Sequence, residues 1–287
     1  MKAPRVVVFG GGHGAAAALR AVRDYAGEVT GVITVADDGG SSGRLRNALD
    51  VVAVGDLRRC LIALAAPGGP WDELFEHRFS AGTLEGHAVG NLVLAGLIEL
   101  HGDLVAALDA AASMLGCFGR ILPSTSEPVV LQAATDDGEV TGQSAINRRA
   151  DVHSVGLLPS APSVPDEVLA AIESADQIVL GPGSLFTSVL ASLIPPRIVS
   201  AVQSSGARKI YVANLREQVP ETLGRSLADH LEALNAHGVK PDVVVFDPSL
   251  GLTRGGIAIE VVEAALSFEN RPMHDPVRLA AVMSTLA

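Results

Sequence analysis

The sequence predicts an α/β fold of the Rossmann-like, doubly wound type: a mostly parallel sheet with helices on both faces and a β-hairpin insertion. Runs of four to six apolar, β-branched residues alternate with helical patterns, which is typical of βαβ units. Hydrophobic residues make up 48% of the 287 residues but aromatic ones only 3%, so Ala, Val, Leu and Ile must build the core. That composition favours buried parallel strands covered by helices. We expect residues 1–287 to form a single domain, with the insertion at about 128–165.

Each expected element follows from a local pattern. Apolar runs predict strands at Arg5–Phe9, Val29–Val35, Gln177–Leu180, Lys209–Val212 and Asp242–Phe246. Helical periodicity predicts helices at Ala15–Tyr25, Leu57–Ala65, Asp72–Phe79, Ala88–Leu100, Leu104–Leu115, Pro165–Ser174, Leu185–Leu193, Ser226–Ala236 and Pro276–Leu286. "VVLQAATDDGEVTGQSAI" alternates and turns at Asp136-Asp137-Gly138, so it predicts a β-hairpin, and a Pro/Ser-rich connector, "LLPSAPSVPDE", follows. "IAIEVVEAALSF" is compatible with a strand or a helix.

Charge and composition exclude several classes of protein. The net charge of −11 argues against a nucleic-acid partner, because basic patches dominate binding to DNA and RNA, but it allows one small anionic ligand. The only cysteines, Cys60 and Cys117, lie in apolar helical stretches and are expected to be buried free thiols, with a disulfide as the weaker alternative. Glycines interrupt both the N-terminal apolar run and "QIVLGPGSLFTSVLASLIPP", so we expect a cytoplasmic protein without membrane insertion.

The segments after the five predicted strands share one character. They read "GGGHG", "ADDGGSSG", "GPGSLFTS", "ANLREQVPET" and "DPSLG", and each carries Gly, Ser, Thr, Asn or Asp. In open α/β sheets, ligands bind at the carboxyl ends of the strands. These five segments therefore predict one ligand-binding edge.

The first of these segments fits a dinucleotide-binding loop. Gly10, Gly12 and Ala15 have the G-x-G-x-x-G/A spacing between a strand and a helix. Glycine there lets the backbone approach a pyrophosphate at the helix N-terminus, although a plain tight turn explains the pattern equally well. His13, in the same loop, has the position of a surface histidine.

The second segment, "VADDGGSSGRLR", combines fixed acids, bare amides, hydroxyls and guanidinium groups. Such a set suits a phosphate held by the loop and by Arg44, with ribose or Mg²⁺ on Asp37 and Asp38. A nicotinamide-dependent oxidoreductase would also place a ribose-binding acid here. It does not need the Gly/Ser/Arg segment that follows, however, and no hydride-transfer constellation is evident downstream. An Asx turn or a helix cap is the structural alternative for either aspartate.

Other polar positions have both a structural and a functional interpretation. Asp56 is placed to cap a helix, and a metal-binding or substrate-binding role is compatible with that position; Arg58 and Arg59 are compatible with solvated helix charges. His87 and Asn91 are four residues apart and thus share a helix face, from which they could reach a ligand or pair between helices.

"GPGSLFTS" supplies glycines and hydroxyls at a helix N-terminus, which suits an anion. It lacks the G-x-S-x-G frame of a serine hydrolase, and the chain has no Walker lysine loop, H-E-x-x-H or cysteine cluster.

Six segments, in one order between residues 5 and 234, carry a family resemblance: "VVVFGGGHG", "ITVADDGGSSGRLR", "VGDLRRCLIALA", "GHAVGNLVLAGL", "ADQIVLGPGSLFTSVL" and "ETLGRSLADHLEAL". Together with "HDPVRLA" near the end, they resemble the YvcK/CofD-like family, and within it the YvcK branch of gluconeogenesis factors, most closely its actinobacterial members. The resemblance implies a Rossmann-like nucleotide-binding domain. The site residues carried over or placed by motif are Gly11, Gly12, His13, Gly14, Asp37, Asp38, Gly40, Ser41, Ser42, Arg44, Asn91, Gly181, Gly183, Ser184 and Asn214.

The two branches of the family imply different functions. YvcK-type proteins bind UDP-activated sugars, notably UDP-N-acetylglucosamine, and support cell shape and growth on gluconeogenic carbon. CofD-type proteins transfer a 2-phospholactyl group from a guanosine-linked donor to a deazaflavin with Mg²⁺, which Asp37 and Asp56 would hold here. Ten aromatic residues offer little stacking surface for a deazaflavin, although Phe186, Trp71 and Phe75 are candidates. We therefore expect a regulator without turnover, with the transferase as the alternative.

Three departures from the family pattern concern selectivity. His13 replaces the usual threonine, "AVGDLRR" lacks the prolines and asparagine of "PPGDIRN", and "LREQVPET" replaces "MTQPGET". They affect the choice of sugar more than nucleotide binding.

We expect a nucleotide-sugar or another nucleotide diphosphate as ligand, no required cofactor apart from Mg²⁺ in the transferase case, and an unidentified protein partner. A homodimer is compatible with the sequence.

Overall fold

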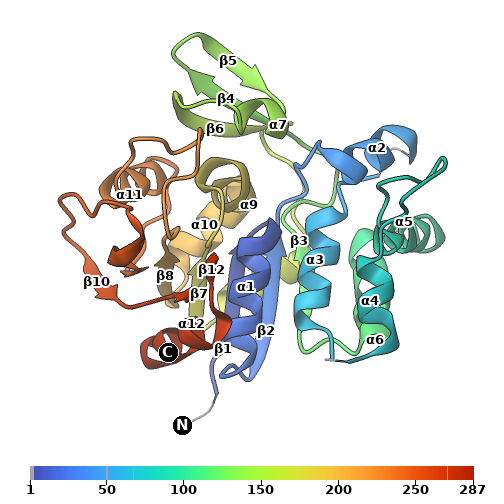
Figure 1. Ribbon diagram of the computed structural model, residues 1–287, viewed down its shortest axis with the longest axis horizontal. Helices are drawn as coiled ribbons and strands as arrows, with labels where there is room; N and C mark the ends of the chain where they lie inside the picture. The colour runs from blue at the N-terminus through green and yellow to red at the C-terminus, as the bar shows by residue number, and fades with distance from the viewer. Residues whose placement is uncertain (1–2, 50, 67, 270) are drawn as a thin grey trace.

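A seven-stranded sheet forms the centre of the protein (Figure 1). The computed structural model describes residues 3–49, 51–66, 68–269 and 271–287. The strands are β1 (Arg5–Gly10), β2 (Glu28–Ile33), β3 (Arg120–Pro123), β7 (Gln177–Leu180), β8 (Arg208–Val212), β9 (Val243–Phe246) and β10 (Glu260–Glu263). They follow the order β10-β9-β8-β7-β1-β2-β3, and every neighbouring pair is parallel. The predicted doubly wound α/β fold is confirmed.

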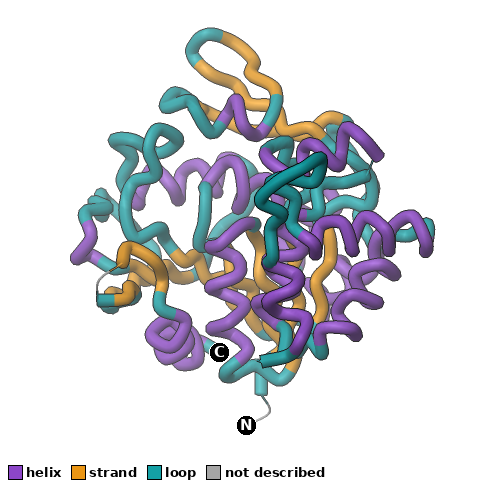
Figure 2. Tube along the Cα trace, turned by 45° about the vertical axis from the view of Figure 1, so that its right-hand side comes forward, coloured by secondary structure: helices purple, strands orange, loops and turns teal. Residues whose placement is uncertain are grey.

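Strand order reverses between β1 and β7. From this point, β1 steps to β2 in one direction and β7 steps to β8 in the other. Right-handed crossovers then place the connecting helices on opposite faces. Helix α1 (Gly12–Arg23) packs with α12 (Pro276–Met283) and α3 (Gly55–Leu64), whereas α8 (Asp166–Ser174) packs with α10 (Pro196–Ser204) (Figures 1 and 2).

The remaining elements complete the layers and the edges. They are α2 (Gly40–Leu49), α4 (Pro70–Glu76), α5 (Val89–His101), α6 (Leu104–Leu115), the π-helix η1 (Leu185–Leu190), α9 (Ala191–Leu193), α11 (Leu227–Ala236), the 3₁₀ helices η2 (Pro248–Leu250) and η3 (Ser284–Leu286), and the hairpin β11 (Ser267–Phe268) with β12 (Arg271–His274).

All five predicted strands are present in the seven-stranded sheet, and the other two strands of that sheet, β3 and β10, were not predicted. β3 has only four residues, too few for a clear period, and β10 lies in the segment that was compatible with strand or helix. The segment Gly40–Leu49, expected to begin as a loop, is helical throughout, with the Gly43 amide donating to Gly39 O at 2.9 Å. The helix predicted at Leu185–Leu193 is present, but its first six residues form the π-helix η1.

A three-stranded antiparallel sheet lies over the carboxyl ends of the main strands (Figure 1, top). It consists of β4 (Val130–Thr135), β5 (Gly138–Thr141) and β6 (Val152–Leu158), in the order β5-β4-β6, and carries α7 (Gln143–Ile146). The predicted hairpin is therefore confirmed, and β6 adds a strand to it. A single-domain arrangement remains our expectation.

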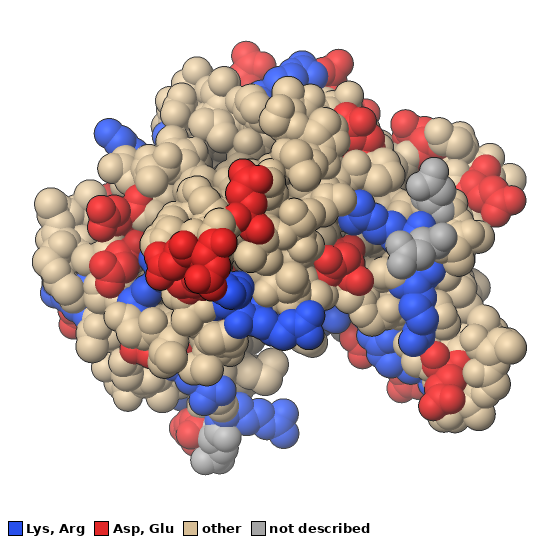
Figure 3. Space-filling view, turned by 90° about the horizontal axis from the view of Figure 1, so that it is seen from above, with Lys and Arg blue, Asp and Glu red and all other residues tan. Residues whose placement is uncertain are grey.

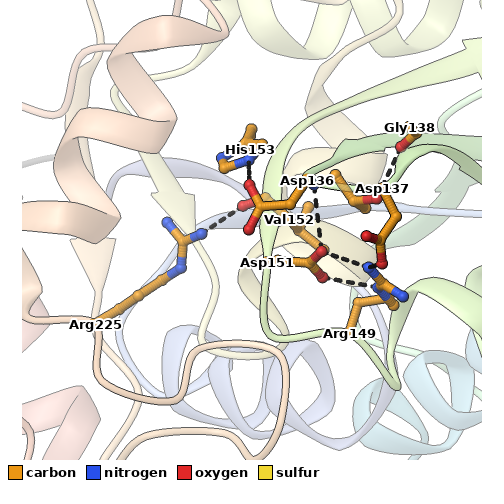
Figure 4. A network of polar contacts seen from close by, with 9 residues as sticks. Asp136, Asp137, Gly138, Arg149, Asp151, Val152, His153 and Arg225 are labelled. Atoms are coloured by element: carbon orange, nitrogen blue, oxygen red, sulfur yellow. Dashed lines mark hydrogen bonds and ion pairs between the residues drawn. The ribbon is translucent and has the colours of Figure 1, made fainter.

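Ionic contacts fasten the turn and the edge of this small sheet (Figure 4). Arg149 donates to Asp137 at 2.7 Å and also pairs with Asp151, while His153 contacts Asp136 at 2.7 Å. Arg225, from the segment before α11, donates to the Val152 carbonyl oxygen. The guanidinium carbon of Arg225 also lies 5.1 Å from the ring centre of Phe186 in η1. Arg225 thus joins the small sheet to the π-helix.

Two properties of the helices and cysteines bear on the sequence expectations. In the described part of the chain, no single helix is long and apolar enough to span a bilayer. The pair Leu185–Leu193 and Pro196–Ser204 meets the length and composition test only jointly, across a bend of 76°. Both cysteines are free, Cys60 buried and Cys117 half-buried, and burial raises the pKa of each thiol.

Because His230 is buried, we expect the stability of the folded protein to decrease in acid. Its Nδ1 lies 2.9 Å from the Tyr211 hydroxyl, and burial lowers its pKa from 6.5 to about 4. The unfolded chain therefore binds a proton at higher pH than the native chain does, so stability falls as the pH drops from about 6.5 towards 4. We expect this residue to account for a loss of about 2 kcal/mol between pH 7 and pH 5. Urea unfolding of wild type and His230→Gln at both pH values measures this loss. If the free energy of unfolding falls equally in both proteins between pH 7 and pH 5, His230 is not its cause.

Candidate functional site

Two glycine-rich loops meet where the strand order reverses. The segment after β1 contains Gly11 and, in the first turn of α1, Gly12 and Gly14, and the loop after β7 contains Gly181 and Gly183. A Cβ on Gly14 would lie 2.1 Å from the Pro182 carbonyl oxygen, and one on Gly183 would lie 3.7 Å from Gly11 O. The two backbones are therefore in direct contact, as the predicted binding edge requires.

Asn214 clamps the second of these loops. Its Nδ2 donates to Gly183 O at 2.9 Å, and its Oδ1 accepts from the Gly183 amide at 3.0 Å. Ser184 receives a hydrogen bond from Gln218 Nε2, and Glu221 accepts from the Thr187 amide at 3.0 Å. The segment after β8 thus holds the loop and the first turn of η1 in place.

A cleft of about 460 Å³ opens beside the first glycine-rich loop, a size suited to a small ligand. It is bounded by the segment after β2 with α2, by the start of α3, and by the segment between α4 and α5. The lining residues are Asp37, Gly39, Gly40, Ser41, Ser42, Arg44, Gly55, Asp56, Arg59, Arg78, Gly86 and Asn91. Basic side chains gather on this side of the molecule, over α2 to α5 (Figure 3, right).

One hydrogen-bonded chain of side chains crosses the wall of the cleft. Arg44 Nε donates to His87 Nε2 at 3.1 Å, and His87 Nδ1 lies 3.1 Å from Ser41 Oγ. Asn91 Nδ2 donates to the same Ser41 oxygen at 3.0 Å. His87 and Asn91 therefore act together with two predicted site residues on α2. The expected shared helix face is wrong for His87, which lies two residues before α5 begins at Val89, and α2 supplies the partners of both side chains.

Two carboxylates face this cleft and influence each other. Burial raises the pKa of Asp37, and the negative charge of Asp56 raises it further. Burial also raises the pKa of Asp56, while its 2.6 Å contact with Arg59 opposes that shift. A Cβ on Gly11 would lie 2.7 Å from Asp56 Oδ2, so the first glycine-rich loop backs onto this acid.

The two aspartates of the "ADDGG" segment have different positions. Asp37 Oδ1 accepts from the Gly39 amide at 3.0 Å, which is an Asx turn, and still lines the cleft. Asp38 is exposed, and its Oδ1 accepts from the Ser144 amide at 2.9 Å in α7. Asp38 thus fastens the small sheet and is absent from the cleft lining. Asp37 forms the Asx turn that was considered for either aspartate and also faces the cleft, whereas the side chain of Asp38 binds a distant segment instead.

Three neighbouring positions differ from their sequence interpretation. Asp56 lies in the first turn of α3, whose N-cap is Val54, and it pairs with Arg59 instead of capping. Arg59 lines the cleft, whereas Arg58 is 4% exposed and donates to Phe75 O at 3.1 Å.

His13 is exposed on the first turn of α1, as expected.

Arg78 is the charged lining residue that the sequence did not indicate. It lies two residues beyond the end of α4, and its NH1 donates to Gly86 O at 2.9 Å. The chain reverses between residues 79 and 87 and so returns Arg78 to the cleft. No local motif marks this reversal. The position of Arg59, by contrast, is marked in the sequence, because the helical i+3 spacing places it on the same helix face as Asp56.

The cleft suits some chemistries better than others. The described residues include no group of three His, Cys, Asp or Glu side chains arranged to hold a metal. Asp37 and Asp56 fit Mg²⁺, which usually takes one or two carboxylates together with substrate phosphates. The three aromatic candidates for stacking do not line the cleft: Phe75 and Phe186 are fully buried, and Trp71 lies on α4.

Comparisons with known proteins identify the family. Residues 6–272 match the family model described as 2-phospho-L-lactate transferase CofD. The chain is 40% identical to the gluconeogenesis factor of Halalkalibacterium halodurans, over 94% of this chain and 86% of that protein. It is also 40% identical to the Bacillus subtilis gluconeogenesis factor, over 82% and 75%. A crystal structure of a UPF0052 family member from Bacillus halodurans superposes with a TM-score of 0.94, at 34% identity and 99% coverage of both chains. The chain therefore belongs to the CofD/YvcK-like family and is similar to its gluconeogenesis factors.

Proposed function

We propose that this protein is a regulator that binds a nucleotide-sugar of the UDP-N-acetylglucosamine type. The observation that carries the proposal is the set of three arginines, Arg44, Arg59 and Arg78, around one cleft in a chain of net charge −11. Such a local reversal of charge suits one small anionic ligand. The regulator would act in the cytoplasm and support gluconeogenic growth and cell-wall or cell-shape control. The role in gluconeogenic growth is suggested by the name of its relatives, the gluconeogenesis factors.

The cleft offers complementary groups to each part of such a ligand. The diphosphate would lie against the arginines, the hydroxyls of Ser41 and Ser42, and the first turn of α2, whose amides favour anions. Asp37 would accept hydrogen bonds from ribose hydroxyls. The two glycine-rich loops allow a close approach of the backbone to the nucleotide. Binding would favour one arrangement of these loops, which a protein partner could then read.

A magnesium-dependent transferase of the CofD type is the second candidate. It is favoured by the family model and by the Asp37–Asp56 pair, which could hold Mg²⁺ against a diphosphate and stabilise charge on a leaving phosphate. The regulator is preferred because none of the three aromatic candidates lines the cleft where a flat acceptor would stack.

Calorimetric titration separates the two functions. Purified protein is titrated with UDP-N-acetylglucosamine, UDP-glucose, GDP and NAD, each in EDTA and in Mg²⁺, and the ligands are then analysed by mass spectrometry. UDP-sugar binding that survives EDTA, with the ligand recovered intact, supports the regulator. A requirement for Mg²⁺ with preference for GDP supports the transferase, and no binding of any nucleotide contradicts both.

Arg44→Ala is expected to weaken nucleotide binding by about tenfold to a hundredfold, because a charge-assisted hydrogen bond is worth about 1.5–3 kcal/mol. Arg46→Ala is the matched control, since Arg46 lies on the same helix but does not line the cleft. The same titrations measure both variants. Equal affinities of Arg44→Ala and wild type would place the diphosphate elsewhere.

A further inference from the structure

The chain of hydrogen bonds through His87 fixes the position of a proton. Arg44 Nε carries a hydrogen and can only donate, so His87 Nε2, at 3.1 Å, must accept. The neutral ring then carries its proton on Nδ1, which donates to Ser41 Oγ at 3.1 Å. Burial and the charge of Arg44 both lower the pKa of His87, which is consistent with a neutral ring.

This tautomer determines where the Ser41 hydroxyl points. Ser41 Oγ accepts from His87 Nδ1 and, at 3.0 Å, from Asn91 Nδ2, so both of its lone pairs are engaged. The Ser41 proton must therefore find an acceptor beyond these two partners. Ser41 lines the cleft, and an acceptor in the cleft, such as a phosphate oxygen, would satisfy it.

The same ring also orients Arg44. The Nε of Arg44 is held by His87, and one terminal nitrogen, NH2, donates to Glu85 O at 2.8 Å. A Cβ on Gly86 would lie 3.1 Å from that nitrogen, so the guanidinium lies directly against the backbone of this segment. Among the described residues, NH1 has no hydrogen-bond partner and is left for a ligand.

We propose that His87 is a positioning residue, which directs the Ser41 hydroxyl and the Arg44 guanidinium towards the diphosphate of the ligand. This inference rests on the proposed function, since it names how that ligand is held. His87 itself, 9% exposed, does not line the cleft and would act only through its two partners.

Two conservative variants separate the two contacts. The amide of His87→Gln can replace Nε2 and accept from Arg44, whereas His87→Asn can replace only Nδ1. We expect His87→Asn to weaken nucleotide binding about tenfold, because Arg44 loses its partner, and His87→Gln to stay within about threefold of wild type. Thermal unfolding of each variant confirms that it is folded.

A double-mutant cycle then tests whether His87 acts through Arg44. In an Arg44→Ala background, His87→Asn should change the affinity less than about twofold, since the contact that it removes is already absent. Additive losses would show that His87 affects binding by another route and would overturn the proposal. If the wild-type protein binds the nucleotide and Arg44→Ala does not weaken that binding, the diphosphate does not lie against Arg44.

The tautomer provides a test that needs no ligand. Long-range ¹H–¹⁵N correlation spectra of the wild-type protein, assigned with His87→Gln, should show His87 protonated at Nδ1 and not at Nε2. The opposite tautomer would overturn the positioning role even if nucleotides bind. A wild-type protein that binds no nucleotide but shows the Nδ1–H tautomer would contradict the proposed function and the role of His87 in it, while leaving the hydrogen-bond geometry intact.

Discussion

Gly14→Ala is expected to destabilise the folded protein by about 3 kcal/mol and to abolish nucleotide binding. The added methyl would lie 2.1 Å from the Pro182 carbonyl oxygen and 2.9 Å from the Gly183 amide nitrogen. Both contacts are with backbone, which cannot move aside as a flexible side chain can. The two glycine-rich loops would therefore separate at the point where the strand order reverses. Urea unfolding measures the first effect, and calorimetric titration measures the second.

Gly96→Ala is the matched control for this substitution. Gly96 also lies inside a helix, α5, and a methyl added there would meet nothing within 4 Å. Because alanine is the better helix former, we expect Gly96→Ala to stabilise the protein by about 0.5–1 kcal/mol. A Gly14→Ala protein as stable as wild type would show that the two loops do not pack as described.

Much of the fold could be predicted from the sequence because its signals are local. The strands that end at Gly10 and Leu180 are buried on both faces, so they appear as apolar runs followed by glycine-rich segments. The ligand-binding edge followed from these strand ends. β3 escaped because four residues carry no period, and α2 escaped because Gly and Ser at its start disguise a helix.

The candidate site was predictable only in part. Asp37, Ser41, Ser42 and Arg44 line the cleft because they follow one strand directly. Arg78 reaches it through a chain reversal, and Asp38 turns away to the small sheet, which is 106 residues further along the chain at Ser144. Such contacts depend on how distant segments pack, and no local pattern records them.

Glu221→Ala is expected to destabilise the protein by about 3 kcal/mol, which combines an unsatisfied buried donor with a cavity. Glu221 is fully buried, and its Oε1 accepts from the Thr187 amide at 3.0 Å and from the Thr187 hydroxyl at 2.9 Å. Without it, the start of the π-helix loses its anchor. Because Thr187 lies in η1, directly after the loop that follows β7, we also expect weaker nucleotide binding at that loop. Urea unfolding and titration measure the two effects.

The charge of Glu221 is expected to matter less than its oxygen atom. Burial raises the pKa of this carboxyl, so the folded protein resists its ionisation. Glu221→Gln keeps an oxygen at the position of Oε1 and removes the charge that burial disfavours, so its stability should stay within about 1 kcal/mol of wild type. Glu232→Ala, at an exposed position on α11, is the control and should change stability by less than about 0.5 kcal/mol. If Glu221→Gln were as destabilising as Glu221→Ala, the ionised carboxylate itself, and not the acceptor atom, would hold the π-helix.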